Sequence, residues 1–289
     1  MSDSSGFEQR LAEAGRMFGC DKVEPHGYHR YYATHLGHLA EMPFKLLEIG
    51  IGGENRETGG ASLHMWRKAF PQAQLYGLDI YPKHELDEPG LATFVVDQGD
   101  AAALTRFCAE HGPFDIIIDD GSHHRSDQLT SLFNLIAQVR PGGYYILEDY
   151  FTAYWPVYDG STLARDLLDT PVRWLKQSID IINRNNLLSS EARALLPDWG
   201  IDALHVYPGV AFLHKAEGDI RGEIPNEEFH ANQAMLDELR YGHLKQWALQ
   251  HYADPMKQVT TLKNLRGWLE SLIAEIDNVP GKSEDQDRA

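Results

Sequence analysis

The 289-residue sequence predicts an α/β protein built on a doubly wound, mostly parallel sheet. Between residues 44 and 150, short apolar runs alternate with segments whose apolar residues recur at helical spacing. The apolar runs lack strict apolar–polar alternation, which is typical of strands buried on both faces of a parallel sheet. Their alternation with helical segments indicates that helices connect successive parallel strands and cover both faces of the sheet.

Five apolar runs and three helical segments make up the predicted sheet and its connections. The runs expected to be strands are PFKLLEIG (43–50), AQLYGLDI (73–80), ATFVVD (92–97), FDIIIDDG (114–121) and YYILEDY (144–150). Helices are expected near residues 61–70, 101–110 and 126–139. We expect the Pro-Gly-Gly turn at 141–143 to end the third helix before the fifth strand begins.

Helical additions are predicted on both sides of this sheet. Apolar residues recur at helical spacing over 7–18 and, less regularly, over 28–39. The segments expected after the fifth strand are a helix over 162–183, a hairpin over 202–215 with its turn at Pro208 and Gly209, helices over 227–251 and 256–277, and a disordered tail. The predicted parts of the chain are a helical preface (1–40), a main domain (41–216), and C-terminal helices with the tail (217–289).

Composition and charge exclude several classes of protein. The chain carries 26 Lys and Arg against 43 Asp and Glu, a net charge of −17, which would repel a nucleic-acid backbone. Cys20 and Cys108 lack the spacing of a structural zinc site. The sequence contains neither a signal peptide nor a stretch of about 18 consecutive apolar residues. We therefore expect a cytoplasmic protein whose partners include neither nucleic acid nor a membrane.

Residues that end the first three strands predict a ligand that contains adenosine. Ligands of open α/β sheets bind outside the carboxyl ends of the strands. Glycines after the first strand allow the backbone to approach a ligand, an acid after the second can bind ribose hydroxyls, and polar residues after the third could read an adenine edge. The candidate cofactor-binding residues are Glu48, Gly50, Gly52, Asp79, Asp97 and Gln98. A glycine turn alone favours a ligand only weakly over a plain tight turn, so the prediction depends on the combination.

The glycine turn departs from the GxGxxG pattern of nicotinamide dehydrogenases. The sixth position counted from Gly50 is Asn55, and the segment ENRETGG separates the turn from the next helix. This spacing argues against a pyrophosphate seated on the helix N-terminus and therefore against a dehydrogenase.

Four carboxylates end the fourth and fifth strands, as Asp119 and Asp120 after one and Glu148 and Asp149 after the other. If these strands are neighbours, the acids gather at one edge, where their mutual repulsion must be relieved by protonation or by a cation. Mg²⁺ binds to a few carboxylates while keeping several waters, and so suits this arrangement. The alternative is that some of these acids cap helices or close turns.

Longer motifs resemble those of a known enzyme family. The pattern ExGxGG, followed by a strand that ends in Asp, resembles the S-adenosylmethionine site of the class I methyltransferases. The motifs LEIGIGG, GGASLHMW, YGLDI, DQGD, GPFDIIIDDGSH, PGGYYILEDY and YWP are similar to those of the macrolide-sugar O-methyltransferases of the mycinamicin and tylosin type. The resemblance, which runs from about Asp21 to Gly160, implies a seven-stranded Rossmann-like sheet and S-adenosylmethionine as cofactor. Those relatives carry a further N-terminal domain, for which we expect the preface to leave no room.

The resemblance also implies roles for the acids and the histidines that follow the fourth strand. It places metal ligands at Asp120, Glu148 and Asp149, the catalytic base at His123, and Asp119 beside the cofactor or in the turn. An alcohol has a pKa near that of water, about 15.7, and attacks a sulfonium methyl poorly. A metal lowers this pKa, and an imidazole with a pKa of about 6.5 can accept the proton. The neighbouring His124 is the rival candidate for the base.

The expected acceptor is an oxygen, most simply one of two adjacent hydroxyls of a sugar that together chelate the metal. Methyltransferases that act on the nitrogen of a base or an amide are expected to carry a [DN]PP[FY]-like loop after the fourth strand, where DDGSH stands instead. Aromatic residues after the fifth strand could cover a sugar or an aglycone, or simply pack in the core: they are Tyr154, Trp155 and Tyr158. In the preface, the residues that could reach the site are Lys22, His26 and Tyr31, although a surface helix explains most of that segment.

The sequence therefore predicts a Mg²⁺-assisted, S-adenosylmethionine-dependent O-methyltransferase of natural product biosynthesis, acting on a small-molecule glycoside or polyol and able to form a homo-oligomer. One alternative is a relative of the cephalosporin-pathway hydroxylases, which share much of this signature but use different acceptor chemistry. Another is a non-catalytic assembly protein that retains the adenosine pocket. His123 and the complete set of acids argue against the second alternative, because a binding protein does not need a costly cluster of like charges.

Overall fold

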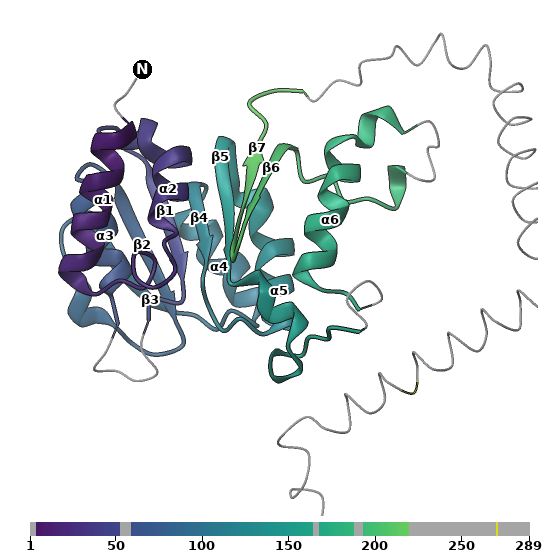
Figure 1. Cartoon of the computed structure of the whole chain (residues 1–289), viewed down its shortest axis with the longest axis horizontal. Coiled ribbons are helices and arrows are strands. Elements are labelled where there is room, and N and C mark those ends of the chain that lie inside the picture. The colour runs from purple at the N-terminus through teal and green to yellow at the C-terminus, as the bar shows by residue number, and fades with distance from the viewer. Residues whose placement is uncertain (1–3, 53–58, 164–167, 188–192, 220–269, 271–289) are drawn as a thin grey trace, which may run out of the picture.

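The structure is built on a seven-stranded sheet with helices on both faces (Figure 1). We describe it from a computed structural model, and the residues described are 4–52, 59–163, 168–187, 193–219 and 270. The strands lie in the order β3-β2-β1-β4-β5-β7-β6. Their bounds are β1 Lys45–Ile49, β2 Gln74–Asp79, β3 Leu91–Val95, β4 Phe114–Asp119, β5 Val139–Glu148, β6 Ile201–Tyr207 and β7 Val210–Lys215.

Strands β1 to β5 pair in parallel, whereas β7 pairs antiparallel with both β5 and β6. The predicted hairpin is confirmed, since Pro208 and Gly209 separate β6 from β7. The predicted α/β class and the mostly parallel, seven-stranded sheet are also confirmed. Because β4 lies between β1 and β5, the carboxyl ends of these three strands meet at one edge of the sheet.

Six α-helices lie around the sheet in the part of the chain that the structure describes. They are α1 Ser4–Phe18, α2 His29–Leu36, α3 Ala61–Ala69, α4 Ala101–His111, α5 Arg125–Leu135 and α6 Pro171–Ile182. Short 3₁₀ helices are η1 Gly37–Leu39, η2 His84–Leu86, η3 Ile136–Gln138, η4 Tyr150–Tyr154, η5 Pro156–Tyr158 and η6 Arg184–Asn186. The helices predicted after the first, third and fourth strands, and both preface helices, are therefore confirmed with small changes at their ends.

Two hydrophobic cores lie on opposite faces of the sheet, and neighbouring residues of one strand belong to different cores. Leu46 packs with the residues of α1, α2 and α3, whereas Leu47 packs with those of α4, α5 and α6. Ile116 and Ile117 divide between the same two cores. Burial on both faces removes the need for polar residues at alternate positions, which explains the continuous apolar runs of the sequence.

The predicted stop at Pro-Gly-Gly was wrong. The helical segment ends earlier, at Gln138, and residues 141–143 lie inside β5. The pairing of β5 with β4 shifts register between Phe114 and Ile116, so the strand is irregular where the proline and glycines lie. Proline and glycine are accommodated at such bulges of a strand, and here they interrupt the ladder without ending the strand.

The helix predicted over 162–183 is shorter, because α6 begins at Pro171. Thr170 has extended backbone angles, and its side chain accepts a hydrogen bond from the Arg173 N–H as the N-cap of α6. A residue before proline is disfavoured in the α conformation, whereas proline itself suits the first position of a helix. Together these two residues set the start of the helix.

The preface packs against the same core as the sheet. Phe7 of α1 lies 5.1 Å from Phe70 between ring centroids, beyond the end of α3. The helices predicted over 227–251 and 256–277, and the predicted tail, lie outside the described residues, and the predicted divisions at residues 40 and 216 stay predictions. None of the described helices has the length and apolar character to span a bilayer.

Candidate functional site

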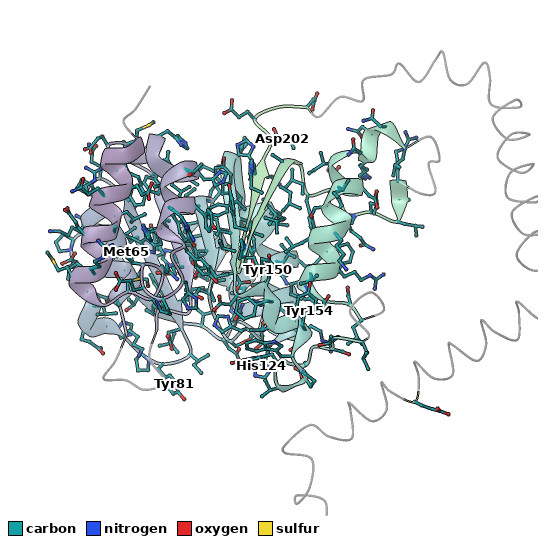
Figure 2. All side chains as sticks on the ribbon, viewed as in Figure 1. Met65, Tyr81, His124, Tyr150, Tyr154 and Asp202 are labelled. Carbon is teal, nitrogen blue, oxygen red and sulfur yellow. The ribbon has the colours of Figure 1, made fainter. Side chains whose placement is uncertain are left out.

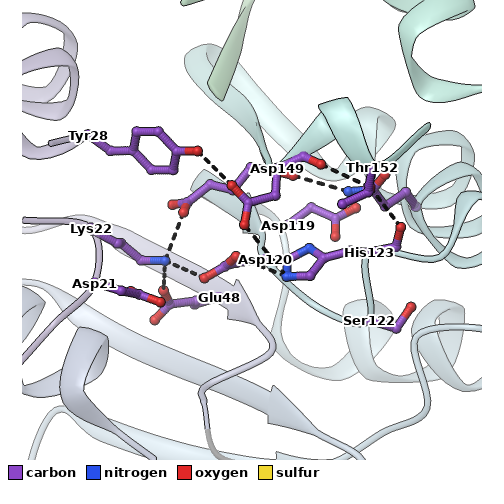
Figure 3. A network of polar contacts seen from close by, with 12 residues as sticks. Asp21, Lys22, Tyr28, Glu48, Asp119, Asp120, Ser122, His123, Asp149 and Thr152 are labelled. Atoms are coloured by element: carbon purple, nitrogen blue, oxygen red, sulfur yellow. Dashed lines mark hydrogen bonds and ion pairs between the residues drawn. The ribbon is translucent and has the colours of Figure 1, made fainter. Parts of the chain in front are cut away.

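The acids predicted to cluster lie together at the carboxyl ends of β1, β4 and β5. Ile49 of β1 is paired with Asp119 of β4, and Asp119 is paired with Leu147 of β5. This register brings Glu48, Asp120, Glu148 and Asp149 to one edge. Figure 3 shows Glu48, Asp120 and Asp149 gathered around Lys22 and His123. The neighbouring strands on which the predicted cluster depended are therefore present.

Lys22 is the buried cation of this cluster. Its Nζ lies 3.1 Å from Glu148 Oε2, 3.4 Å from Glu48 Oε1 and within hydrogen-bond distance of Asp120 Oδ2, and its side chain is 1% exposed. Burial disfavours the charged form, but the carboxylates of Asp120, Glu148 and Glu48 outweigh it and raise the pKa of Lys22 well above its usual value. The ammonium thus offsets part of the negative charge that three strand ends bring together.

Two tyrosines from the start of α2 bind the same acids. The Tyr28 hydroxyl donates a hydrogen bond of 2.6 Å to Asp149 Oδ1, and the Tyr32 hydroxyl donates to Glu148 Oε1. Sequence reasoning named Lys22 among the residues that could reach the site but missed both tyrosines. Their spacing of four, which places both on one helical face, is a signal that could have found them. His26 and Tyr31, the other residues named with Lys22, ring-stack on Tyr28 and Tyr207.

His123 lies beside the two aspartates. Its Nε2 is 4.0 Å from Asp120 Oδ1 and 3.8 Å from Asp149 Oδ2. His123 and Asp149 both have left-handed backbone angles, with φ of 59° and 49°. The Thr152 hydroxyl lies 3.0 Å from the His123 carbonyl oxygen and 2.9 Å from the Asp149 carbonyl oxygen. Since such backbone angles are unfavourable for residues other than glycine, the surrounding contacts must hold both residues in place.

His124 faces a different partner. It precedes α5, and its Nδ1 lies 3.5 Å from Asp159 Oδ2. In Figure 2, His124 and Tyr154 lie toward one end of the sheet and Asp202 toward the other. Of the two histidines left open by the sequence, His123 is therefore the one that contacts the acid cluster.

The donor atoms of Asp120, His123 and Asp149 suit a divalent cation. One ligand atom from each lies within 4.8 Å of the others, and this is the one such group of His, Cys, Asp or Glu found among the described residues. Burial raises the pKa of Asp120, and burial together with the Asp120 charge raises the pKa of Glu148 well above its usual value. A hard cation relieves this charge and prefers oxygen ligands, so these residues fit Mg²⁺.

Glu148, the third predicted metal ligand, has both carboxylate oxygens occupied. Oε2 accepts from Lys22 and Oε1 accepts from Tyr32. Because each carboxylate oxygen has two lone pairs, a cation bound here would share an oxygen with Lys22 or Tyr32, or displace one of them.

The glycine turn after β1 packs closely against β4. A Cβ atom on Gly50 would lie 2.2 Å from the Asp120 carbonyl oxygen, and its φ of 77° favours glycine. Gly52 also has a positive φ, 84°, but a Cβ there would meet the nearest atom, of Gly59, at an ordinary 3.5 Å. Glu48 is fully buried and accepts a 2.8 Å hydrogen bond from the Ser62 hydroxyl. Neighbouring backbone therefore explains Gly50, whereas Gly52 has space on its open side.

Asp79 and Asp97, the acids predicted to bind cofactor after β2 and β3, accept hydrogen bonds from their own loops. Asp79 Oδ1 accepts from the Tyr81 N–H at 2.9 Å, and Asp97 Oδ1 accepts from the Gly99 N–H at 2.8 Å. Each carboxylate has a second oxygen through which a ribose or an adenine could be bound.

Gln98 and Asp119 instead form a buried pair. Gln98 Nε2 donates to Asp119 Oδ1 at 2.6 Å, and Asp119 Oδ2 accepts from the Tyr145 hydroxyl at 2.7 Å and from Ser131. Burial raises the pKa of Asp119 to about 6. The side-chain amide of Gln98 is also bound at its oxygen, which accepts from the Ser122 N–H at 2.9 Å. Contact of either side chain with adenine would require these bonds to change.

The aromatic loop after β5 lies next to both histidines. The Tyr158 ring is 6.3 Å from that of His123 and 5.4 Å from that of His124, and Phe151 is 5.2 Å from Trp155. Trp155 is 47% exposed, so it is not a core residue in this structure. The predicted contact of Tyr154, Trp155 and Tyr158 with an acceptor stays a prediction.

Comparison with curated proteins finds similar methyltransferases. The chain is 42% identical over 202 residues to Mycinamicin VI 2''-O-methyltransferase of Micromonospora griseorubida, an alignment that covers 69% of this chain and 50% of that protein. It is 39% identical over 207 residues to Demethylmacrocin O-methyltransferase of Streptomyces fradiae, covering 70% and 52%. The chain thus spans about half the length of the curated relatives it matches. No protein-family model matches it.

Solved structures give the same result. The chain superimposes with a TM-score of 0.69 on the MycE methyltransferase from the mycinamycin biosynthetic pathway in complex with Mg, SAH and Mycinamycin VI. The two are 40% identical, and the match covers 75% of this chain and 55% of that one. A second crystal form of the same enzyme with Mg and SAH matches with a TM-score of 0.71.

Proposed function

Since the chain is a homologue of the macrolide- and polyketide-sugar O-methyltransferases, we propose that it transfers a methyl group from S-adenosylmethionine to a sugar hydroxyl with the help of Mg²⁺. The observation that carries this proposal is the meeting of Asp120, His123 and Asp149, whose ligand atoms lie within 4.8 Å of one another. Two carboxylates that can bind a cation thus lie beside an imidazole that can accept a proton.

The cofactor is assigned to the ends of β1, β2 and β3. Asp79 is the proposed ribose ligand, because its side chain lies at a strand end and its Oδ1 accepts a hydrogen bond from its own loop, which leaves Oδ2 as the proposed acceptor for the ribose hydroxyls. Asp97 and Gln98 are proposed to lie beside the adenine. Gly50 and Gly52 belong to the turn after β1, which is proposed to let the cofactor approach the backbone. Glu48 and Asp119 are proposed to support this pocket from beneath, since both are fully buried.

Asp120, Glu148 and Asp149 would hold Mg²⁺. When bound, the ion would lower the pKa of the acceptor hydroxyl, and S-adenosylmethionine would supply the methyl group. His123 accepts the hydroxyl proton on its imidazole as the acceptor oxygen forms its new bond to carbon. Asp120 and Asp149 orient the acceptor, and their negative charge favours the imidazolium that results.

A vicinal diol is the proposed acceptor. Two adjacent hydroxyls can chelate a cation held by the carboxylates at this edge of the sheet. One of the two hydroxyls would then lie next to His123. Tyr154, Trp155 and Tyr158 are proposed to cover the sugar, because aromatic faces suit the apolar face of a pyranose and Trp155 is 47% exposed. We place the reaction in natural product biosynthesis in the cytoplasm, with a small glycoside or polyol as the substrate and no nucleic acid as a partner. The proposed assembly is a homo-oligomer.

The test uses S-adenosylmethionine with a deuterated methyl group, Mg²⁺ and a panel of glycosides with and without vicinal hydroxyls. Mass spectrometry is expected to show a labelled methyl ether of a vicinal-diol glycoside and no product with Asp120→Asn. Glycosides in which either hydroxyl is replaced by hydrogen should react slowly or not at all. A product that gained an oxygen and no label would instead support the hydroxylase alternative, and cofactor binding without any product would support the binding-protein alternative.

A further inference from the structure

The segment that leads into α2 holds one oxygen of each site aspartate. Asp120 Oδ2 accepts from Lys22, and Asp149 Oδ1 accepts from Tyr28 at 2.6 Å. The remaining oxygens, Asp120 Oδ1 and Asp149 Oδ2, lie 4.0 Å and 3.8 Å from His123 Nε2 (Figure 3). Both aspartates therefore divide their oxygens in the same way, one toward the N-terminal segment and one toward the histidine.

Tyr28 is fixed on several sides. It is 3% exposed, and its ring stacks on His26 with centroids 5.0 Å apart. A Cβ atom on Gly209 would lie 1.9 Å from the Tyr28 hydroxyl oxygen, so the glycine of the β6–β7 turn leaves the room that the hydroxyl occupies. The Gly209 carbonyl accepts a 2.6 Å hydrogen bond from the Asp149 N–H. One turn thus positions the backbone of Asp149 and the tyrosine that binds its side chain.

Lys22 is fixed by its backbone as well as by its charge. Its carbonyl accepts from the His29 N–H at 3.0 Å, at the start of α2. Its buried ammonium contacts one carboxylate at the end of each of β1, β4 and β5. These contacts restrict the direction from which a cation or a substrate can approach each carboxylate. A carboxylate otherwise rotates readily, because the last torsion of an aspartate has broad energy wells.

We propose that Lys22 and Tyr28 are positioning residues of the methyl-transfer site, which hold one oxygen of Asp120 and of Asp149 so that the other faces the position shared by the cation and the acceptor hydroxyl. This inference rests on the proposed function, since it takes the two aspartates as ligands of Mg²⁺. Partners that orient ligating side chains typically contribute about 10- to 100-fold to metal affinity.

The test compares two tyrosines that differ in what they bind. Tyr28→Phe removes the hydroxyl that holds Asp149, while Tyr150→Phe removes a hydroxyl that donates a 2.8 Å hydrogen bond to the Tyr207 carbonyl. Isothermal titration of each purified full-length protein with Mg²⁺ alone is expected to show a dissociation constant about 10- to 100-fold higher for Tyr28→Phe and an unchanged one for Tyr150→Phe. Melting temperatures without metal show how far each variant is destabilised.

Lys22→Met is the second variant. It leaves the buried Glu48 and Glu148 and the partly buried Asp120 without their counter-ion and is expected to lower the melting temperature strongly. Lys22→Arg, which keeps the charge, is therefore measured beside it. Recovery of the melting temperature without recovery of Mg²⁺ affinity in Lys22→Arg is expected if the placement of the ammonium matters.

The outcomes separate this inference from the proposed function. If the wild-type protein binds Mg²⁺ and Asp120→Asn abolishes the binding, but Tyr28→Phe binds as the wild type does, the positioning role is overturned and the metal role stands. An equal loss of Mg²⁺ affinity in Tyr28→Phe and Tyr150→Phe also overturns the positioning role, because the loss would then not depend on the hydrogen bond to Asp149. If the wild type does not bind Mg²⁺ at all, both proposals fail together.

Discussion

The acids after β4 and β5 and the acids after β2 and β3 occupy equivalent strand ends, but they obtain their partners in opposite ways. Asp120 and Asp149 bind side chains that are 98 and 121 residues away in the sequence. Asp79 and Asp97 bind backbone N–H groups only two residues further along. The first pair belongs to a network that connects distant segments of the fold, whereas the second pair is held by its own turns.

This difference indicates a division of work. A network of charges held from distant segments keeps its geometry before any ligand arrives, as the activation of an acceptor requires. Acids in local turns can change their side-chain conformation when a ligand such as a nucleoside binds. Substitutions in the two regions should therefore affect different steps of the reaction.

The largest effect is expected from Asp120→Asn. The substitution removes one negative charge from the proposed metal ligands, and a contribution of several kcal/mol from the metal corresponds to about a 10²- to 10⁴-fold loss of turnover. Affinity for S-adenosylmethionine should stay close to that of the wild type. Equal losses of turnover and of cofactor affinity would remove the distinction between the two regions.

His123→Ala should lower turnover by about 10²-fold, a typical contribution of a general base. His124→Ala provides the control, because its imidazole lies beside Asp159 and not beside the site aspartates, so its turnover should stay close to that of the wild type. Steady-state kinetics at saturating substrates compare the two variants. A loss of turnover in His124→Ala alone would exchange the roles of the histidines.

Asp119 connects the two regions, since it is bound by Gln98 after β3 and lies one residue before Asp120. Burial raises its pKa to about 6 from the ordinary 3.8. The folded protein therefore holds this proton more tightly than the unfolded chain, and the stability from this group is complete below about pH 4 and lost as the pH rises through 6. Urea unfolding should show that the stability of the wild type relative to Asp119→Asn falls by about 2 kcal/mol between pH 4 and pH 7. A pH-independent difference between the two proteins would contradict the buried, protonating carboxyl.

The smallest effect is expected from Asp79→Ala. Loss of a charged acceptor for the ribose should weaken S-adenosylmethionine binding by about tenfold, since a hydrogen bond to a charged group contributes about 1.5 kcal/mol at the low end of its range. Turnover at saturating cofactor should be nearly unchanged, the reverse of Asp120→Asn. Equilibrium binding measures the change, and unchanged affinity would contradict the assignment of the ribose to this strand end.

The sequence predicted the parts of this molecule that depend on local patterns. The five parallel strands follow from apolar runs, the hairpin from Pro208 and Gly209, and the cluster of acids from where β4 and β5 end. The start of α6 at Pro171 could also have been predicted, because a threonine followed by proline is typical of a helix start. The prediction of a helix over 162–183 instead extended the helical pattern across this position. Pro-Gly-Gly at 141–143 was misinterpreted, because a bulged strand and a turn have the same residue preferences.

The sequence indicated that Lys22 could reach the site, but local patterns did not show which acids Lys22 and the two tyrosines bind. Lys22, Tyr28 and Tyr32 precede the sheet by many residues, and only the packing of α1 and α2 against it brings them to the carboxyl ends of β4 and β5. The choice between His123 and His124 likewise depends on a left-handed backbone at His123 that no local pattern announces. Contacts between distant segments are decided by tertiary packing, which a single sequence does not reveal.

The central claim is that Asp120 and Asp149 hold a divalent cation beside His123. Anomalous diffraction from crystals of the full chain saturated with Mn²⁺, which replaces Mg²⁺ in oxygen-rich sites, tests it most directly. We predict one strong peak within coordination distance of Asp120 Oδ1 and Asp149 Oδ2. Crystals in which both aspartates are ordered and no peak lies between them would contradict the account.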